Sequence, residues 1–241
     1  MNEAKIHQES THFKKLQDYL REFVYGGIDG AVTTFAVVAG GFGADLDAGI
    51  IIILGLANLF ADGFSMSVGA YLSSKSEKEN YKKHEAIEYW EIENLPEVER
   101  EEISDIYKAK GFKGELLEKI VDQITSDKDL WVAEMMKDEL NMMEEAKSPF
   151  KIGLATFISF LLVGFIPLLV YLWDFFYPTS INIFVWTSIL TGFAFVIVGW
   201  LKSIVNQTSA LRSIGETVAL GLLAAVVAFY VGDILEKFFI K

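Results

Sequence analysis

The sequence predicts an all-α polytopic membrane protein with five transmembrane helices and an acidic helical insert between the second and the third. Two observations support this fold class. Apolar residues make up 52% of the chain and come in long runs, whereas most charges lie in one block. A bilayer core about 30 Å thick takes roughly 20 helical residues to cross, and five stretches are long and apolar enough.

Composition excludes several classes of protein. The chain has no cysteine, so disulfides, thiolate metal sites and thiol catalysis are absent. A net charge of −12 excludes a typical nucleic-acid-binding surface, which is basic. Residues 1–22 are polar and charged without an apolar run, so we expect a cytosolic amphipathic leader here and no signal peptide.

The five spans are expected at residues 23–43, 49–72, 152–172, 181–201 and 213–235, so that residues 23–72 hold helices one and two and residues 149–241 hold helices three to five. Asp29 and Asp62 are the only charges in the first and second spans. The third and fourth spans carry none, and Glu216 and Asp233 lie near the two ends of the fifth.

Lysine and arginine mark every second connection, which predicts the orientation by the positive-inside rule. The leader, the insert and the connection that contains Lys202 and Arg212 are basic, whereas the first and third loops contain no lysine or arginine. We therefore expect the N-terminus and the insert in the cytosol and the C-terminus outside. Lys237 and Lys241, in the tail, are the only bases against this topology.

The insert, residues 73–148, is rich in glutamate but has the pattern of a folded domain. Leu95-Pro96 predicts a helix break with Pro96 at the start of the next helix, which Gly111 ends. Apolar residues between positions 103 and 124 follow helical spacing, and residues 130–143 are expected to form another helix. We expect three or four helices in a small cytosolic domain.

Four side chains within the spans are candidates for ion translocation. Asp29 lies about two turns from the cytosolic end of span one, and Met66 lies about two turns from that end of span two. Asn58, Asp62 and Met66 share one helix face, with Asp62 deeper. A carboxylate, an amide and a thioether suit a borderline-soft divalent ion. The alternatives are that both aspartates only hydrogen-bond neighbouring helices and that Met66 only packs.

Gly26 and Gly30 form a small-xxx-small pair in span one. Such a pair allows two helices to approach closely. It favours either a homodimer through span one, with two Asp29 residues across a shared axis, or close packing within one protomer.

The insert carries pairs of glutamates at i, i+3 spacing, together with methionines on a later helix. The candidate metal ligands are Glu88, Glu91, Glu99, Glu102, Met135, Met136 and Glu139. Carboxylates at this spacing converge on divalent ions, and thioether sulfur biases the choice toward Fe²⁺. The alternative is an ordinary solvated acidic face. A di-iron oxidase is disfavoured, because the insert has one histidine, His84, and no Glu-x-x-His motif.

The first two spans resemble those of the vacuolar iron transporter family. The resemblance is carried by GIDGAVTTFAVVAG at residues 27–40 and GLANLFADGFSMSVGAYLS at residues 55–73. It continues through the insert and the last three spans. Two positions depart from the family pattern: many members have a small residue at the position of Asp62, and some have glutamate at that of Ala70.

The resemblance implies a transporter, not an enzyme, that exports cytosolic Fe²⁺ in exchange for protons and has no fixed cofactor. It implies a homodimer of five-span protomers in a cell membrane or a vacuolar membrane, with the ion path at the dimer interface. Asp29 and Met66 match the family's translocation ligands, and the seven insert residues match its metal site. Two alternatives remain open: a Mn²⁺ transporter of the same architecture, and a membrane-anchored iron buffer or sensor.

Overall fold

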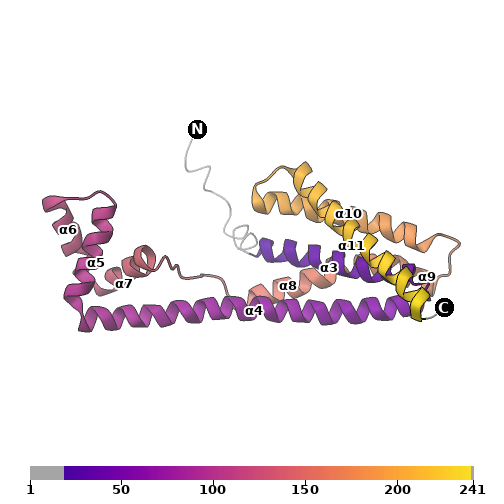
Figure 1. The fold of residues 1–241 in the computed structure, drawn as a ribbon, viewed down its shortest axis with the longest axis horizontal. Helices are drawn as coiled ribbons and strands as arrows, with labels where there is room; N and C mark the ends of the chain where they lie inside the picture. Colours follow the sequence, from indigo (N-terminus) through magenta and orange to yellow (C-terminus); the bar gives the residue numbers. More distant parts are fainter. Residues whose placement is uncertain (1–18, 240–241) are drawn as a thin grey trace. The chain divides into compact units, whose positions relative to one another are not determined.

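The computed structural model describes residues 19–239, so most of the expected leader lies outside the described residues. The described part of the chain is helical and contains no strand. Five helices in it are long and apolar enough to cross a membrane, which confirms the predicted fold class (Figure 1). They are α3 (Leu20–Gly43), α4 (Ala48–Asn94), the broken helix Pro149–Phe176, α10 (Ile183–Asn206) and α11 (Ala210–Phe239).

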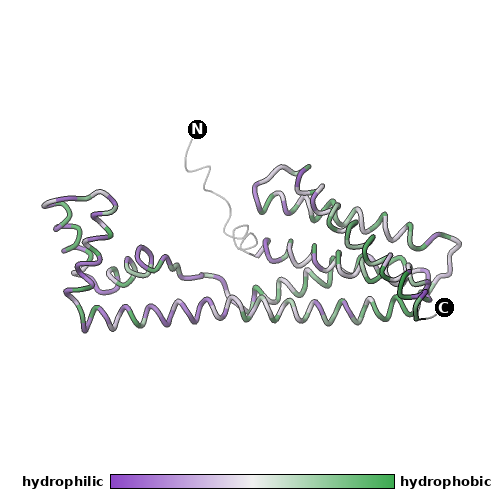
Figure 2. The backbone as a smooth tube through the Cα atoms, in the orientation of Figure 1, coloured by the Kyte–Doolittle hydropathy of each residue, from purple (hydrophilic) through white to green (hydrophobic). Residues whose placement is uncertain are grey.

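The chain divides into two compact units. One consists of Met1–Leu72 and Lys147–Lys241, and the other of Ser73–Ala146. Helix α4 contributes its apolar first part to the membrane unit and its polar second part to the insert. Figure 2 shows this change in hydropathy along α4 and the apolar character of the other long helices.

Helix α3 is the central helix of the membrane unit, because it contacts α8 (Pro149–Gly164), α10 and α11. Its glycines allow the close approach. A Cβ at Gly26 would lie 2.4 Å from the Ser159 hydroxyl, and one at Gly30 would lie 2.4 Å from the Phe160 carbonyl oxygen. The pair therefore packs against α8 within one protomer, which is the second of the two expected uses.

The third span, expected at residues 152–172, lies within the candidate span Pro149–Phe176, but it is not one continuous α-helix. Helix α8 ends at Gly164, a short 3₁₀ segment η2 (Ile166–Leu168) follows, and α9 (Leu169–Phe176) completes the span. Pro167 explains the interruption, because it has no N–H to donate to the carbonyl four residues earlier. The Leu168 N–H instead donates to the Phe165 carbonyl at 3.0 Å.

The insert folds around the predicted break. Helix α4 ends at Asn94, and α5 (Pro96–Ala109) begins at the proline. Gly111 has a φ of +101°, which explains why the chain turns there before α6 (Gly114–Thr125). Buried apolar side chains from all these helices form one core.

The last helix of the insert is shorter than predicted. Asp127 caps α7 (Lys128–Glu134) by accepting hydrogen bonds from the N–H groups of Asp129 and Leu130. A π-helical turn, η1 (Met135–Glu139), follows directly. The expected helix over residues 130–143 is thus wrong beyond Glu139, since Asn141 has a left-handed φ of 53° that ends regular helix.

We expect Gly30→Ala to lower the apparent melting temperature of the detergent-solubilised protein by about 2–10 °C, because the new methyl group overpacks the α3–α8 contact at backbone atoms. Gly192→Ala is the matched control, since a Cβ there meets nothing within 4 Å. Equal melting temperatures for Gly30→Ala and the wild type would contradict the close α3–α8 packing.

Candidate functional site

The insert brings glutamates of two helices together where α4 meets α5. Glu88 and Glu91 lie in the last turns of α4, and Glu99 and Glu102 lie in the first turns of α5. The Leu95-Pro96 break turns the chain sharply between the two helices (Figure 1), which brings glutamates of α4 and α5 together. Carboxylate oxygens of Glu88, Glu91 and Glu99 lie within 4.8 Å of one another.

Two members of this group are held out of water. Glu88 is only 3% exposed and Glu99 only 4%. The Oε2 atom of each is buried and has no hydrogen-bond partner among the described residues. Buried carboxylate oxygens normally have a partner, so two without one mark a place where a proton or a cation completes the structure.

Burial and mutual repulsion change the acidity of the cluster. Burial, with repulsion from Glu139, Glu99 and other glutamates, raises the pKa of Glu88 to about 7. Burial, with repulsion from Glu102, Glu91 and Glu139, raises the pKa of Glu99 to about 7. The pKa of Glu139 is also raised, first by burial and then by repulsion from Glu102 and Glu91. All five predicted glutamates therefore act on one another.

The π-helical turn η1 supplies the other predicted ligands. Met135 and Met136 are 0% and 1% exposed and belong to the same core as the inner faces of α4 and α5. Glu139, at the end of η1, lies near enough to Glu88 and Glu99 to affect their pKa values. Single π turns are frequent at functional sites.

A set of polar contacts not foreseen from the sequence holds η1 against α5. The Lys110 ammonium pairs with Asp138 and lies 4.3 Å from the centre of the Tyr107 ring. The Tyr107 hydroxyl donates to Glu134 at 3.0 Å, and burial with this bond raises the pKa of Tyr107 to about 12. The hydrogen bond from Lys110 lowers the pKa of Asp138. These residues position the methionines.

The arrangement is suited to divalent cations. Several carboxylates offer hard oxygen ligands in number, and two buried thioethers beside them favour a borderline-soft ion over Mg²⁺ or Ca²⁺. A cation bound here would replace protons on Glu88 and Glu99, since a carboxylate ligand must be deprotonated to bind. Of the seven predicted ligands, Glu88, Glu91 and Glu99 lie close together, Glu102 and Glu139 act on them electrostatically, and the two methionines lie in the core of the same unit.

In the membrane unit, the structure brings the two intramembrane aspartates to one level. Gly30 and Gly63 both pack on Phe160, and Asp29 and Asp62 directly precede these two glycines. Their charges interact across the gap between α3 and α4. Asp29 is exposed on the surface of the protomer, and Asp62 is half-buried.

Met66 and Asn58 each lie one turn from Asp62 on the same stripe of α4, and both are half-buried. This stripe borders the buried face of α4, where Gly55 packs on Leu168 and Gly63 on Phe160. Asp29 thus lies level with Asp62. The sequence pattern predicts Asp29 level with Met66, which is one helical turn away from Asp62.

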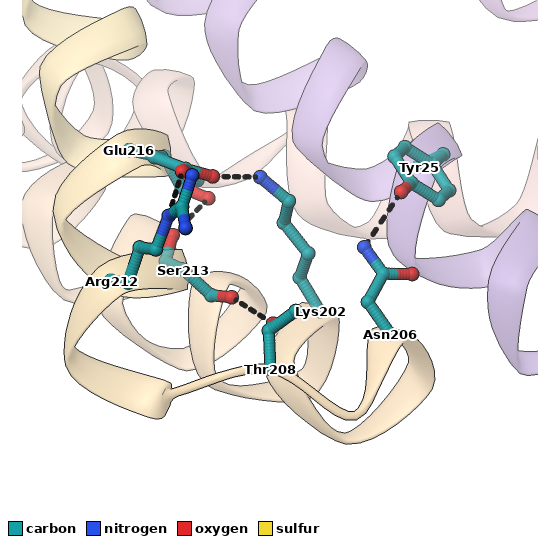
Figure 3. Close-up of polar contacts among 8 residues, drawn as sticks. Tyr25, Lys202, Asn206, Thr208, Arg212, Ser213 and Glu216 are labelled. Carbon is teal, nitrogen blue, oxygen red and sulfur yellow. Dashed lines mark hydrogen bonds and ion pairs between the residues drawn. The ribbon is translucent and has the colours of Figure 1, made fainter.

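Glu216 has a structural role. It accepts hydrogen bonds from Lys202 and Arg212, each at 3.0 Å, and so ties α10 to α11 beside their turn (Figure 3). At the same turn Asn206 donates to the Tyr25 hydroxyl at 3.0 Å (Figure 3). Tyr25 lies one turn before Asp29, so this bond fixes the end of α3 near the aspartate.

We expect the metal affinity of the insert to depend on pH below about 7. Protons compete with the cation for Glu88 and Glu99, so the affinity falls as pH is lowered, by up to about tenfold per pH unit for each proton displaced. Anaerobic titration of the purified full-length protein with Fe²⁺ between pH 5.5 and 8.5 measures this slope. A metal affinity that stays constant from pH 5.5 to 7 would contradict the raised pKa values of Glu88 and Glu99.

We expect Glu99→Gln to weaken metal binding and yet stabilise the metal-free protein. A carboxyl group whose pKa is raised in the folded state lowers the stability of the protein as the pH rises from about 4.5, the pKa in the unfolded chain, through about 7, the pKa in the folded protein. A neutral amide at this position does not ionise, so the protein keeps this stability. Melting temperatures at pH 8 with chelator present, and again with metal, measure both effects. Glu101→Gln, on the exposed face of α5, is the matched control and should change neither.

Comparison with known proteins identifies the family. The model of the VIT family matches residues 20–233. A vacuolar iron transporter of Toxoplasma gondii is 40% identical over 67% of this chain and 54% of its own length. Those of Plasmodium falciparum and Arabidopsis thaliana are 32% and 29% identical over 96% and 95% of this chain, and 86% and 91% of their own lengths. The chain therefore belongs to the VIT family, whose members are membrane transporters and not enzymes.

Proposed function

We propose that the chain exports Fe²⁺ from the cytosol across its membrane in exchange for protons, as a homodimer with the insert on the cytosolic side. The observation that carries the proposal is a carboxylate, Asp29, exposed on the surface of a membrane span beside a second carboxylate, Asp62. The vacuolar iron transporters similar to this chain support iron as the cargo.

The exposed position of Asp29 supports a path at an interface between two copies. A charged group in contact with lipid costs on the order of 2.5–3.5 kcal/mol by insertion scales, so such groups face water or a partner. A second copy across a two-fold axis would cover Asp29 and place four aspartates around one path. The glycine pair of α3 is already used against α8, which leaves the Asp29 face of α3 free for this contact.

The insert supports the capture of cytosolic ions. Its acidic surface raises the local concentration of cations, and the buried cluster around Glu88 and Glu99 then selects divalent ions by ligand chemistry. Met66, one turn from Asp62 on α4, adds a sulfur ligand within the span. The same ligand types thus occur in both units, which suits one ion moving from one to the other.

Proton exchange follows from the chemistry of carboxylates in a medium of low dielectric constant. Such a group binds a proton more readily than in water, and a metal ion displaces that proton. Two neighbouring aspartates can therefore alternate between protonated and metal-bound forms. Export of Fe²⁺ would then be driven by protons moving in the opposite direction.

A Mn²⁺ transporter of the same architecture is the alternative within this class, because Mn²⁺ accepts the same carboxylate ligands. Thioether sulfur in both the insert and the span favours Fe²⁺. Flux of each ion in competition, measured in proteoliposomes, separates the two. A membrane-anchored buffer or sensor would bind metal in detergent but give no flux in liposomes.

We expect Asp29→Asn to lower Fe²⁺ flux into proteoliposomes at least tenfold while metal binding by the insert stays unchanged. The amide cannot carry a proton or neutralise the cation in the span. The assay uses an acidic lumen, an entrapped iron-sensitive dye and anaerobic Fe²⁺. Asp233→Asn is the control, since Asp233 pairs with Lys237 near the end of α11.

We expect Glu99→Gln to act differently in the same assay. It should raise the Fe²⁺ concentration for half-maximal flux and leave the maximal rate nearly unchanged, because it impairs capture and not the path. Wild-type flux in Asp29→Asn would contradict the role of Asp29 in the ion path. Loss of maximal flux in Glu99→Gln would contradict the claim that capture by the insert is a separate step.

A further inference from the structure

Three threonine hydroxyls are buried without a partner inside the membrane unit. They are Thr34 in α3 and Thr187 and Thr191 in α10, and each side chain is 0% exposed. None of the three hydroxyl oxygens has a hydrogen-bond partner in the described part of the chain. A buried hydroxyl without a partner is costly, so three of them in one helical unit require an explanation.

Other hydroxyls in the same helices are satisfied locally. Thr33 donates to the carbonyl of Asp29 at 2.8 Å, Thr156 to that of Ile152 at 3.0 Å, and Thr217 to that of Ser213 at 2.9 Å. This bond to the carbonyl four residues earlier is available to any helical threonine. Since the three buried threonines do not make it, their hydroxyls point elsewhere in the interior.

The three threonines come from neighbouring parts of α3 and α10. Phe35, directly after Thr34, contacts both Phe184 and Phe195, with ring centres 6.4 and 6.2 Å away. The stretch of α10 between those two phenylalanines contains Thr187 and Thr191, one turn apart. The α10 threonines therefore lie alongside the part of α3 that carries Thr34.

This region lies at the break in the third span. One turn before Thr34, Gly30 packs on the carbonyl of Phe160 in α8, and one turn after it, Val38 shares a core cluster with Leu168 of η2. Helices α3 and α10 both contact η2. Thr34 is thus level with the segment that joins α8 to η2.

The break changes the backbone hydrogen bonds of the third span. In a continuous helix the N–H of Leu168 would donate to the Gly164 carbonyl, but it donates to Phe165 instead. Broken helices within membranes are tolerated where hydroxyl side chains or ordered water satisfy the freed backbone groups. The three hydroxyls lie in the same region as this break, and none of them bonds a backbone carbonyl of the described residues there.

We propose that one or more ordered water molecules bind at the α8–η2 break and join the hydroxyls of Thr34, Thr187 and Thr191 to one another and to the backbone of the break. A buried water makes two to four hydrogen bonds, which matches the donors and acceptors present. The three hydroxyls are neutral and act as both donors and acceptors, which suits water better than a cation. The site is inside one protomer, whereas Asp29 lies on its surface.

The test replaces each hydroxyl by a methyl group of similar shape. Thr191→Val and Thr187→Val should each lower the apparent melting temperature by about 2–4 °C, because a water-linked hydrogen bond is lost. The double variant should lose less than the sum, since the two hydroxyls share the water. Thr191→Ser should retain most of the stability, and Thr217→Val, whose hydroxyl bonds its own helix, is the matched control.

Opposite outcomes overturn the proposal. If the hydroxyls are truly without a partner, replacing them by methyl groups raises or preserves the melting temperature, and the effects add. If the melting temperature depends on the Na⁺ concentration in the wild type and not in Thr191→Val, the site binds a cation and not water. Should Thr34→Val fail to fold, the two α10 variants decide the question alone.

Discussion

The crowding of carboxylates away from water is the constraint on which the rest of the structure depends. Glu88 and Glu99 are almost fully buried, each has an oxygen without a partner within residues 19–239, and three further glutamates repel them. Such a group is stable only with protons or with a multivalent cation. The same constraint acts in the spans, where Asp29 and Asp62 lie at one level without a lysine or arginine in either predicted span.

The surrounding elements keep these carboxylates in place. The turn at Leu95-Pro96 sets α5 against the end of α4, and the ion pair of Lys110 with Asp138 holds the π turn that carries the methionines. In the membrane unit, close packing of Gly30 on Phe160 fixes the height of Asp29, and the bond between Tyr25 and Asn206 fixes the end of α3. In each unit, rigid packing of neighbouring residues positions the acidic side chains.

Much of this arrangement was predictable because it depends on local patterns. Apolar length predicted the five spans, Pro96 predicted the helix break, and the i, i+3 spacing predicted which glutamates share a helix face. The π turn and the 3₁₀ break were not predicted, because both depend on tertiary contacts that compete with ordinary helix. The glycine pair could not be assigned from spacing alone, and the buried threonines only acquire meaning once their missing partners are known.

The central claim is that a divalent ion displaces protons from the buried glutamates of the insert. Calorimetric titration of Fe²⁺, under anaerobic conditions and in two buffers with different ionisation enthalpies, counts the protons released per ion bound. With the pKa values of Glu88 and Glu99 at about 7, we predict release of more than one proton at pH 6 and almost none at pH 8.5. Binding at pH 6 with no proton release would contradict the account.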